Sequence, residues 1–148
     1  MRRVRYIFDY SDQLMLSIFK LGGYEGSQPE LAAWLAHEDA PEFILCEDEK
    51  FARFLNGLII NKRGSKEGDG TPEPESKLSN NIVLRKLKIA LNLQADNLLE
   101  MLKLNDVTLS KHELSALFRR PDHKNYRDCP DQLLSNFLDG MEALYRKN

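Results

Sequence analysis

The feature that most constrains the fold is an internal repeat, because residues 2–60 align with residues 85–143 at a constant offset of 83 positions without a gap. Identical residues are spread over the whole alignment. They include Leu31/Leu114, Ala33/Ala116, Cys46/Cys129, Asp48/Asp131, Phe54/Phe137 and Gly57/Gly140. Chance similarity between two amphipathic stretches rarely keeps one register through the loops as well. We therefore expect two copies of one module.

The boundaries follow from the alignment and from composition. We expect the first copy over residues 1–60, a polar linker over 61–80 and the second copy over 81–148. The linker contains Gly64, Gly68, Gly70, Pro72 and Pro74, which is typical of a flexible connection. A module this short buries only a small core, so the copies are expected to pack on each other or across a dimer.

The second copy predicts four helices. Asn80 or Asn81 caps a first helix to about Leu91, and a second helix covers roughly 96–104. Ser110 and Glu113 form a capping box for a third helix, which Pro121 stops. A last helix follows Pro130.

The first copy repeats this pattern with one difference. Gly22-Gly23 ends its second helix, and Ser27 to Glu30 reads as its capping box. Its first helix starts almost at Met1 and lacks a counterpart to Asn80–Val83. Because no strand pattern competes, the predicted fold is all-α, with two four-helix modules that resemble helix-turn-helix units.

Composition excludes several classes of protein. The net charge of −2 gives no overall attraction to nucleic acid or to an anionic membrane. No apolar run is long enough to span a membrane, and the N-terminus does not resemble a signal peptide, so a cytoplasmic location is expected. No phosphate loop, dinucleotide motif or metalloprotease helix occurs, so no cofactor is predicted.

Several stretches carry a family resemblance. They are Asn80–Leu93, Leu109–Arg120, Asp122–Tyr126 and, in the first copy, Phe54–Ile60. Together they resemble the YehS-like family of small bacterial proteins, and the resemblance covers nearly the whole chain, including its duplication. The family has no established activity, so the resemblance implies the fold but no catalytic residue.

The second copy contains a candidate nucleic-acid surface. A third helix that follows a turn and carries outward basic residues is typical of repressor-type DNA binding. The candidate residues are Lys111, Ser115, Arg119, Arg120, Lys124 and Arg127. A solvated helix face is the alternative interpretation. The corresponding surface of the first copy, with Glu38 and Glu42, would repel phosphate.

Cys46 and Cys129 precede the last helix of their copies. Buried packing is the simpler interpretation, and a thiolate nucleophile activated by the helix N-terminus is the alternative. A metal site built from these cysteines with His37 and His123 would require the copies to face each other, and no metal is predicted.

Taken together, these patterns favour a non-catalytic binding or adaptor protein that uses its helix faces to hold a protein partner or to self-associate. Duplicated core and capping residues are present, but no duplicated reactive constellation accompanies them. Nucleic-acid binding through the second copy is the alternative, and we do not expect an enzyme.

Overall fold

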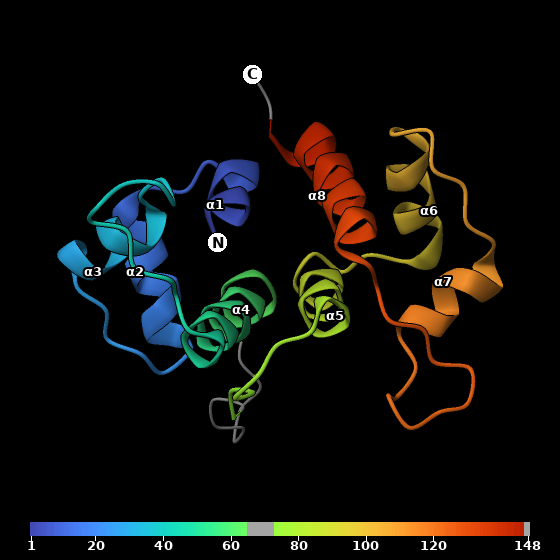
Figure 1. Ribbon diagram of the computed structural model, residues 1–148, viewed down its shortest axis with the longest axis horizontal. Coiled ribbons are helices and arrows are strands. Elements are labelled where there is room, and N and C mark those ends of the chain that lie inside the picture. The colour runs from blue at the N-terminus through green and yellow to red at the C-terminus, as the bar shows by residue number, and fades with distance from the viewer. Residues whose placement is uncertain (65–72, 147–148) are drawn as a thin grey trace. The chain divides into compact units, whose positions relative to one another are not determined.

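The computed structural model describes residues 1–64 and 73–146 and divides the chain into two compact units (Figure 1). Unit 1 is Met1–Leu78 and unit 2 is Ser79–Asn148. The predicted all-α class is confirmed for the described residues, whose regular elements are all helices. Of the predicted linker, Gly68, Gly70 and Pro72 lie outside the described residues.

The described residues of unit 1 form four helices: α1 (Arg2–Phe8), α2 (Asp12–Leu21), α3 (Gln28–Leu35) and α4 (Asp48–Arg63). As expected, the glycine pair ends α2: Gly22 is its C-cap, and Gly23 follows with φ 91°, a conformation that glycine adopts without strain. The last helix runs to Arg63, beyond the predicted end of the first copy, and two basic residues lie in its final turn, where they favour the helix dipole.

Unit 2 repeats the order with α5 (Asn80–Ala90), α6 (Ala95–Lys103), α7 (Lys111–Leu117) and α8 (Asp131–Tyr145). The cap of α5 is Ser79, whose side chain accepts a hydrogen bond from the Ile82 N–H, and not Asn80 or Asn81 as predicted. Both asparagines are thereby free to bond elsewhere in the unit. The third helix ends at Leu117, so Arg119 and Arg120 follow it in a turn.

In each unit the second helix packs against the last one, and a glycine permits the contact (Figure 1). A Cβ atom on Gly140 would lie 2.7 Å from the carbonyl oxygen of Met101. A Cβ on Gly57 would overlap the carbonyl of Ile18, the residue that corresponds to Met101 at the offset of 83. Close helix approach therefore explains both glycines, despite their cost inside a helix.

The cores of the two units are built from corresponding residues. Phe19, Leu31, Trp34 and Phe54 are buried in unit 1, and their counterparts are buried in unit 2. Those counterparts are Leu102, Leu114, Leu117 and Phe137. Trp34 faces the core of unit 1, and its ring lies 5.2 Å from that of Phe19.

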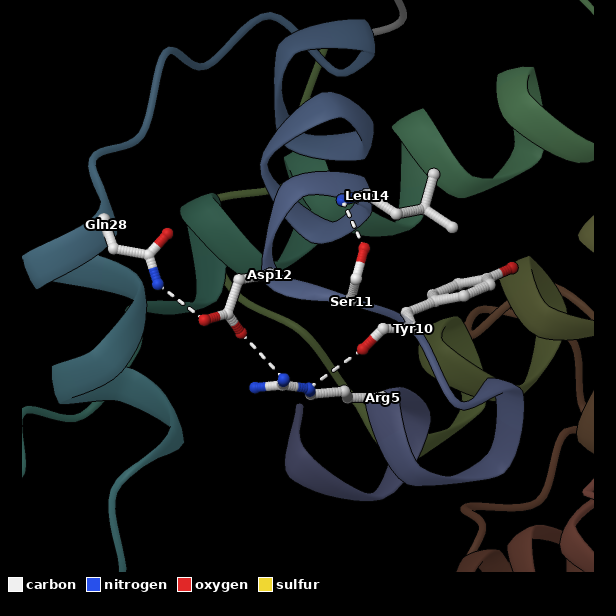
Figure 2. Close-up of polar contacts among 6 residues, drawn as sticks. All are labelled: Arg5, Tyr10, Ser11, Asp12, Leu14 and Gln28. Atoms are coloured by element: carbon white, nitrogen blue, oxygen red, sulfur yellow. Dashed lines mark hydrogen bonds and ion pairs between the residues drawn. The ribbon is translucent and has the colours of Figure 1, made fainter.

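Polar contacts tie α1 to the rest of unit 1 (Figure 2). The guanidinium of Arg5 lies 2.7 Å from the carboxylate of Asp12 and also donates to the carbonyl of Tyr10. The other carboxylate oxygen of Asp12 accepts a hydrogen bond from Gln28, at the start of α3. One side chain at the start of α2 thus connects three helices.

The two predicted capping boxes differ. In unit 2 the box is complete, because Ser110 accepts from the Glu113 N–H and Glu113 accepts from the Ser110 N–H, each at 3.0 Å. In unit 1 Ser27 caps α3, but the carboxylate of Glu30 accepts from the hydroxyl of Tyr24 at 2.6 Å. The residue of unit 2 that corresponds to Tyr24 is Val107, which has no hydroxyl to compete for the carboxylate of Glu113.

Candidate functional site

Between its third and fourth helices each unit carries a long loop, and the two loops share one backbone arrangement. Loop 1 is residues 36–47 and loop 2 is residues 119–130. The N–H of Ile44 donates to the carbonyl of Ala33, and the N–H of Arg127 donates to that of Ala116, both at 3.1 Å. Two further backbone bonds near each loop's tip also repeat at the offset of 83. The loops are therefore fixed scaffolds.

Loop 1 presents exposed apolar side chains among acidic residues. Ile44 is 59% exposed and Leu45 is 75% exposed. Four exposed acids lie in residues 37–47, and no lysine or arginine does. They are Glu38, Asp39, Glu42 and Glu47. Large aliphatic residues that are left in water on a fixed loop are typical of a contact surface.

Loop 2 has different chemistry on the same backbone. Arg127 and Asp128 stand where loop 1 has Ile44 and Leu45. Residues 120–130 contain three basic and two acidic side chains, a surplus of one positive charge. Loop 2 projects from the end of α7 (Figure 1).

The candidate nucleic-acid residues lie on α7 and loop 2, but they do not form one helix face. Lys111 and Ser115 are exposed on α7, whereas Arg120, Lys124 and Arg127 are exposed on the loop. The predicted outward position of Arg119 on the helix differs from the structure, because the residue follows the helix end and is partly buried. Its Nε is buried without a hydrogen-bond partner among the described residues.

Neighbouring carboxylates offset part of this basic charge. The ammonium of Lys111 lies 3.7 Å from Asp96, and the guanidinium of Arg120 lies 3.3 Å from Asp122. All four side chains are largely exposed, so these pairs are weak and are screened by salt. Lys124 and Arg127 form no ion pair with any described residue.

Asn81 holds the base of loop 2 through its side-chain amide, which is buried. Its nitrogen donates to the carbonyls of Leu117 at 2.9 Å and Arg127 at 2.8 Å. Its oxygen accepts from the N–H of Cys129 at 2.8 Å. The first helix, the end of the third helix and the last part of the loop are thereby connected by one carboxamide, which satisfies three backbone groups.

Both cysteines lie at the end of their loop and are poor nucleophiles. Burial raises the pKa of the Cys46 thiol and of the Cys129 thiol to about 11. A protonated thiol at neutral pH does not attack, which argues against the alternative of an activated thiolate. Packing against the start of the last helix is the role that the geometry supports.

The described residues contain no group of three or more histidine, cysteine, aspartate or glutamate side chains placed to hold a metal ion. None of the helices within the described ranges is long and apolar enough to cross a membrane.

Sequence reasoning missed Asn81 and the Ile44–Leu45 pair. The asparagine was interpreted as a cap, although its lack of a counterpart in the first copy marked it as special. The aliphatic pair gives no signal in an alignment of shared residues, because it differs between the two copies. Comparing the copies for differences at exposed positions would have found Ile44/Arg127 and Leu45/Asp128.

Comparison with known proteins supports the duplication. A family described as "Protein of unknown function (DUF1456)" matches residues 1–64 and again residues 80–147. The chain is 43% identical over 143 residues to the uncharacterized protein YehS of Escherichia coli strain K12, which covers 97% of this chain and 92% of that relative. No solved structure matches significantly.

Proposed function

The chain belongs to the DUF1456 family of proteins of unknown function, and we propose that it is a non-catalytic binding module that holds a protein partner on loop 1. The observation that carries the proposal is the contrast between the loops. Ile44 and Arg127 donate the same backbone hydrogen bond, yet one side chain is aliphatic and the other is cationic. A conserved scaffold with altered exposed side chains is what divergence in partner recognition produces.

The chemistry of loop 1 defines the partner. An apolar centre with a charged rim is the usual anatomy of a protein interface. Since the rim here is acidic, the partner is expected to present an apolar patch bordered by lysine and arginine. A second copy of loop 1 is a poor occupant, because the two acidic rims would repel each other.

The test places a photo-crosslinking amino acid at Leu45 of the full chain in living cells, with the same substitution at Asp128 as the matched control. We expect one protein to be crosslinked from position 45 and not from position 128. That protein is then purified, and its affinity is measured by calorimetry for the parent chain and for the variant Ile44→Asp with Leu45→Asp.

Burying a charge in place of an aliphatic side chain is expected to weaken binding at least about tenfold, since ~1.4 kcal/mol suffices for that change. Added salt should weaken the parent complex by screening the acidic rim. Equal crosslinking from both positions, crosslinking only to a second copy, or unchanged affinity of the double variant would refute the proposal.

A second candidate is nucleic-acid binding through α7 and loop 2. The observation in its favour is that Lys124 and Arg127 are exposed on loop 2 and form no ion pair with any described residue, and that Lys111 is exposed on α7. Against it, Asp96 and Asp122 offset two of the cations.

This second candidate predicts affinity for a labelled duplex DNA that falls steeply with salt, because each phosphate contact contributes a slope of about −0.9 in log K against log salt. The variant Lys124→Ala with Arg127→Ala should reduce that slope by roughly two. Glu38→Ala with Glu42→Ala in loop 1 serves as the control and should not lower affinity. Absent or salt-independent binding removes this candidate.

A further inference from the structure

Unit 2 contains a pocket of about 370 Å³ between α7, loop 2 and the start of α8 (Figure 1). Its apolar lining comes from Leu109, Ala116, Leu117 and Leu133. Polar side chains of α7 and loop 2 complete the lining, all of which belongs to unit 2. A concave apolar place of this volume with a few polar groups has the composition of a small-molecule site.

Unit 1 occupies the corresponding place with an aromatic ring of its own. The hydroxyl of Tyr24 donates to the carboxylate of Glu30 at 2.6 Å. A Cβ atom on Gly26 would lie 3.6 Å from the ring of Tyr24. At the offset of 83, Glu30 and Gly26 correspond to Glu113 and Leu109, which both line the pocket of unit 2. The ring of Tyr24 therefore marks what the same scaffold holds at this place.

A second ring and a cation accompany Tyr24 in unit 1. The rings of Tyr24 and Trp34 lie 6.1 Å apart, and the ammonium of Lys50 lies 5.5 Å and 5.7 Å from their centres. The corresponding residues of unit 2 are Val107, Leu117 and Leu133. Unit 2 thus keeps the backbone of this place without its aromatic contacts, and an aromatic ring is the group that complements the pocket.

The polar side chains of the pocket carry both signs of charge. The guanidinium of Arg127 forms no hydrogen bond or ion pair with any described residue, so it is not joined to the nearby acids Glu113 and Asp128. The carboxylate of Glu113 accepts from the N–H of Ser110, and that of Asp128 accepts from the hydroxyl of Tyr126. Since a carboxylate has about four acceptor positions, both acids can accept further hydrogen bonds.

We propose that this pocket is a binding site for a free aromatic amino acid. Its ring packs against Leu117 and Leu133, its carboxylate pairs with Arg127, and its ammonium lies at the carboxylates of Glu113 and Asp128. A zwitterion fits this lining because it supplies both charges next to one ring. Arginine binds a carboxylate through two parallel hydrogen bonds, whereas a ligand with a single charge would leave the opposite charge of the pocket covered and unpaired.

The proposal is independent of any partner on loop 1, because the pocket lies in the other unit. An NMR titration of the isotope-labelled full chain with L-phenylalanine tests it. We expect saturable shifts with a Kd below about 1 mM, largest at the amides of residues 109–117 and 125–133. Three analogues each remove one group: 3-phenylpropanoate lacks the ammonium, phenethylamine lacks the carboxylate, and L-alanine lacks the ring. Each should bind at least about tenfold more weakly.

The variant Arg127→Met keeps the length of the side chain and removes its charge. It should weaken the binding of L-phenylalanine at least about tenfold and leave the melting temperature nearly unchanged, because the side chain is exposed. Lys124→Met is the matched control, since it removes a cation of the same loop that does not line the pocket, and should not change the affinity.

Three results would overturn the proposal. They are the absence of saturable binding or shifts confined to unit 1, an analogue that binds as tightly as L-phenylalanine, and equal affinity of the Arg127→Met variant and the parent chain.

Discussion

At the scale of single residues, Asn81 contributes more to unit 2 than its place in the sequence suggests. Two asparagines in succession before an apolar helix are typical of a cap, and only the folded chain brings Leu117, Arg127 and Cys129 to the same side chain. Its partners lie 36 to 48 positions away, so no local pattern reveals them. A buried amide with three backbone partners is a structural requirement of the loop.

Replacing Asn81 by leucine tests this role. The change Asn81→Leu leaves one N–H and two carbonyls unpaired in a buried place and should destabilise the protein by roughly 2–4 kcal/mol. Urea denaturation measures the loss. The control is Asn125→Ala in loop 2, an exposed side chain, which should cost under about 0.5 kcal/mol. Similar stabilities for the two variants would contradict the assignment.

Gly140 offers a second test at this scale. A Cβ there would lie 2.6 Å from the Cβ of Met101 and 2.7 Å from its carbonyl oxygen, so Gly140→Ala should destabilise by roughly 1–3 kcal/mol despite the better helix propensity of alanine. Thermal unfolding followed by circular dichroism measures the change. The variant Ala143→Gly, at an exposed position of α8, serves as the control and should lower the free energy of unfolding by about 1 kcal/mol through helix propensity alone. A stabilised Gly140→Ala variant would exclude close packing.

The thiols predict how stability depends on pH. The folded chain keeps the protons of Cys46 and Cys129 up to a pKa of about 11, whereas an unfolded thiol loses its proton near the usual value of about 9. Between these values the unfolded state binds fewer protons, so the free energy of unfolding falls as pH rises from about 9 to about 11. Urea titrations across this range should show a shallower fall in the variant Cys46→Ala with Cys129→Ala. An unchanged slope would contradict burial of the thiols.

At the scale of the elements, the sequence was a good guide to helices and a poorer one to their ends. Periodic apolar residues and the glycine pair identified every helix, because these signals are local. Where a helix begins or ends depends on which of several neighbouring groups forms the capping hydrogen bonds. The sequence predicts that Glu30 completes a capping box, but its carboxylate accepts a hydrogen bond from the hydroxyl of Tyr24. Likewise, the residue that caps α5 is Ser79 and not one of the two asparagines that follow it. The path of each loop could not be predicted, since the bond that ties it to the third helix joins residues eleven positions apart.

The contacts of Asp12 are a prediction about how elements are joined. Removing its carboxylate in Asp12→Ala breaks the ion pair with Arg5 and the bond from Gln28 that connect α1, α2 and α3 (Figure 2). Since both ionic side chains are more than a third exposed, the expected loss is about 0.5–1 kcal/mol in urea denaturation. Asp96→Ala is the control, because it also removes an acid from a first helical turn, and its pair with Lys111 is more exposed. A larger loss in the control would contradict the tethering role.

At the scale of the whole molecule, duplication explains both what the units share and what they do not. Corresponding glycines, core residues and loop bonds keep one scaffold in each unit. The differences gather where the scaffold meets solvent, at Ile44–Leu45 against Arg127–Asp128. The repeat and the all-α class were readable from the sequence because identity at a fixed offset survives divergence of the surface. The function could not be read from the sequence, because neither loop carries a reactive group that belongs to a recognisable motif.

The shared scaffold is the central claim, and native-state hydrogen exchange of the full chain tests it most directly. The amides of Ile44 and Arg127 each donate to a carbonyl at the end of the third helix of their unit. We predict that both are protected, in loops where the unbonded amides exchange quickly, and that both respond alike to mild denaturant. Protection of one amide together with rapid exchange of the other would show that residues 83 positions apart do not occupy equivalent places.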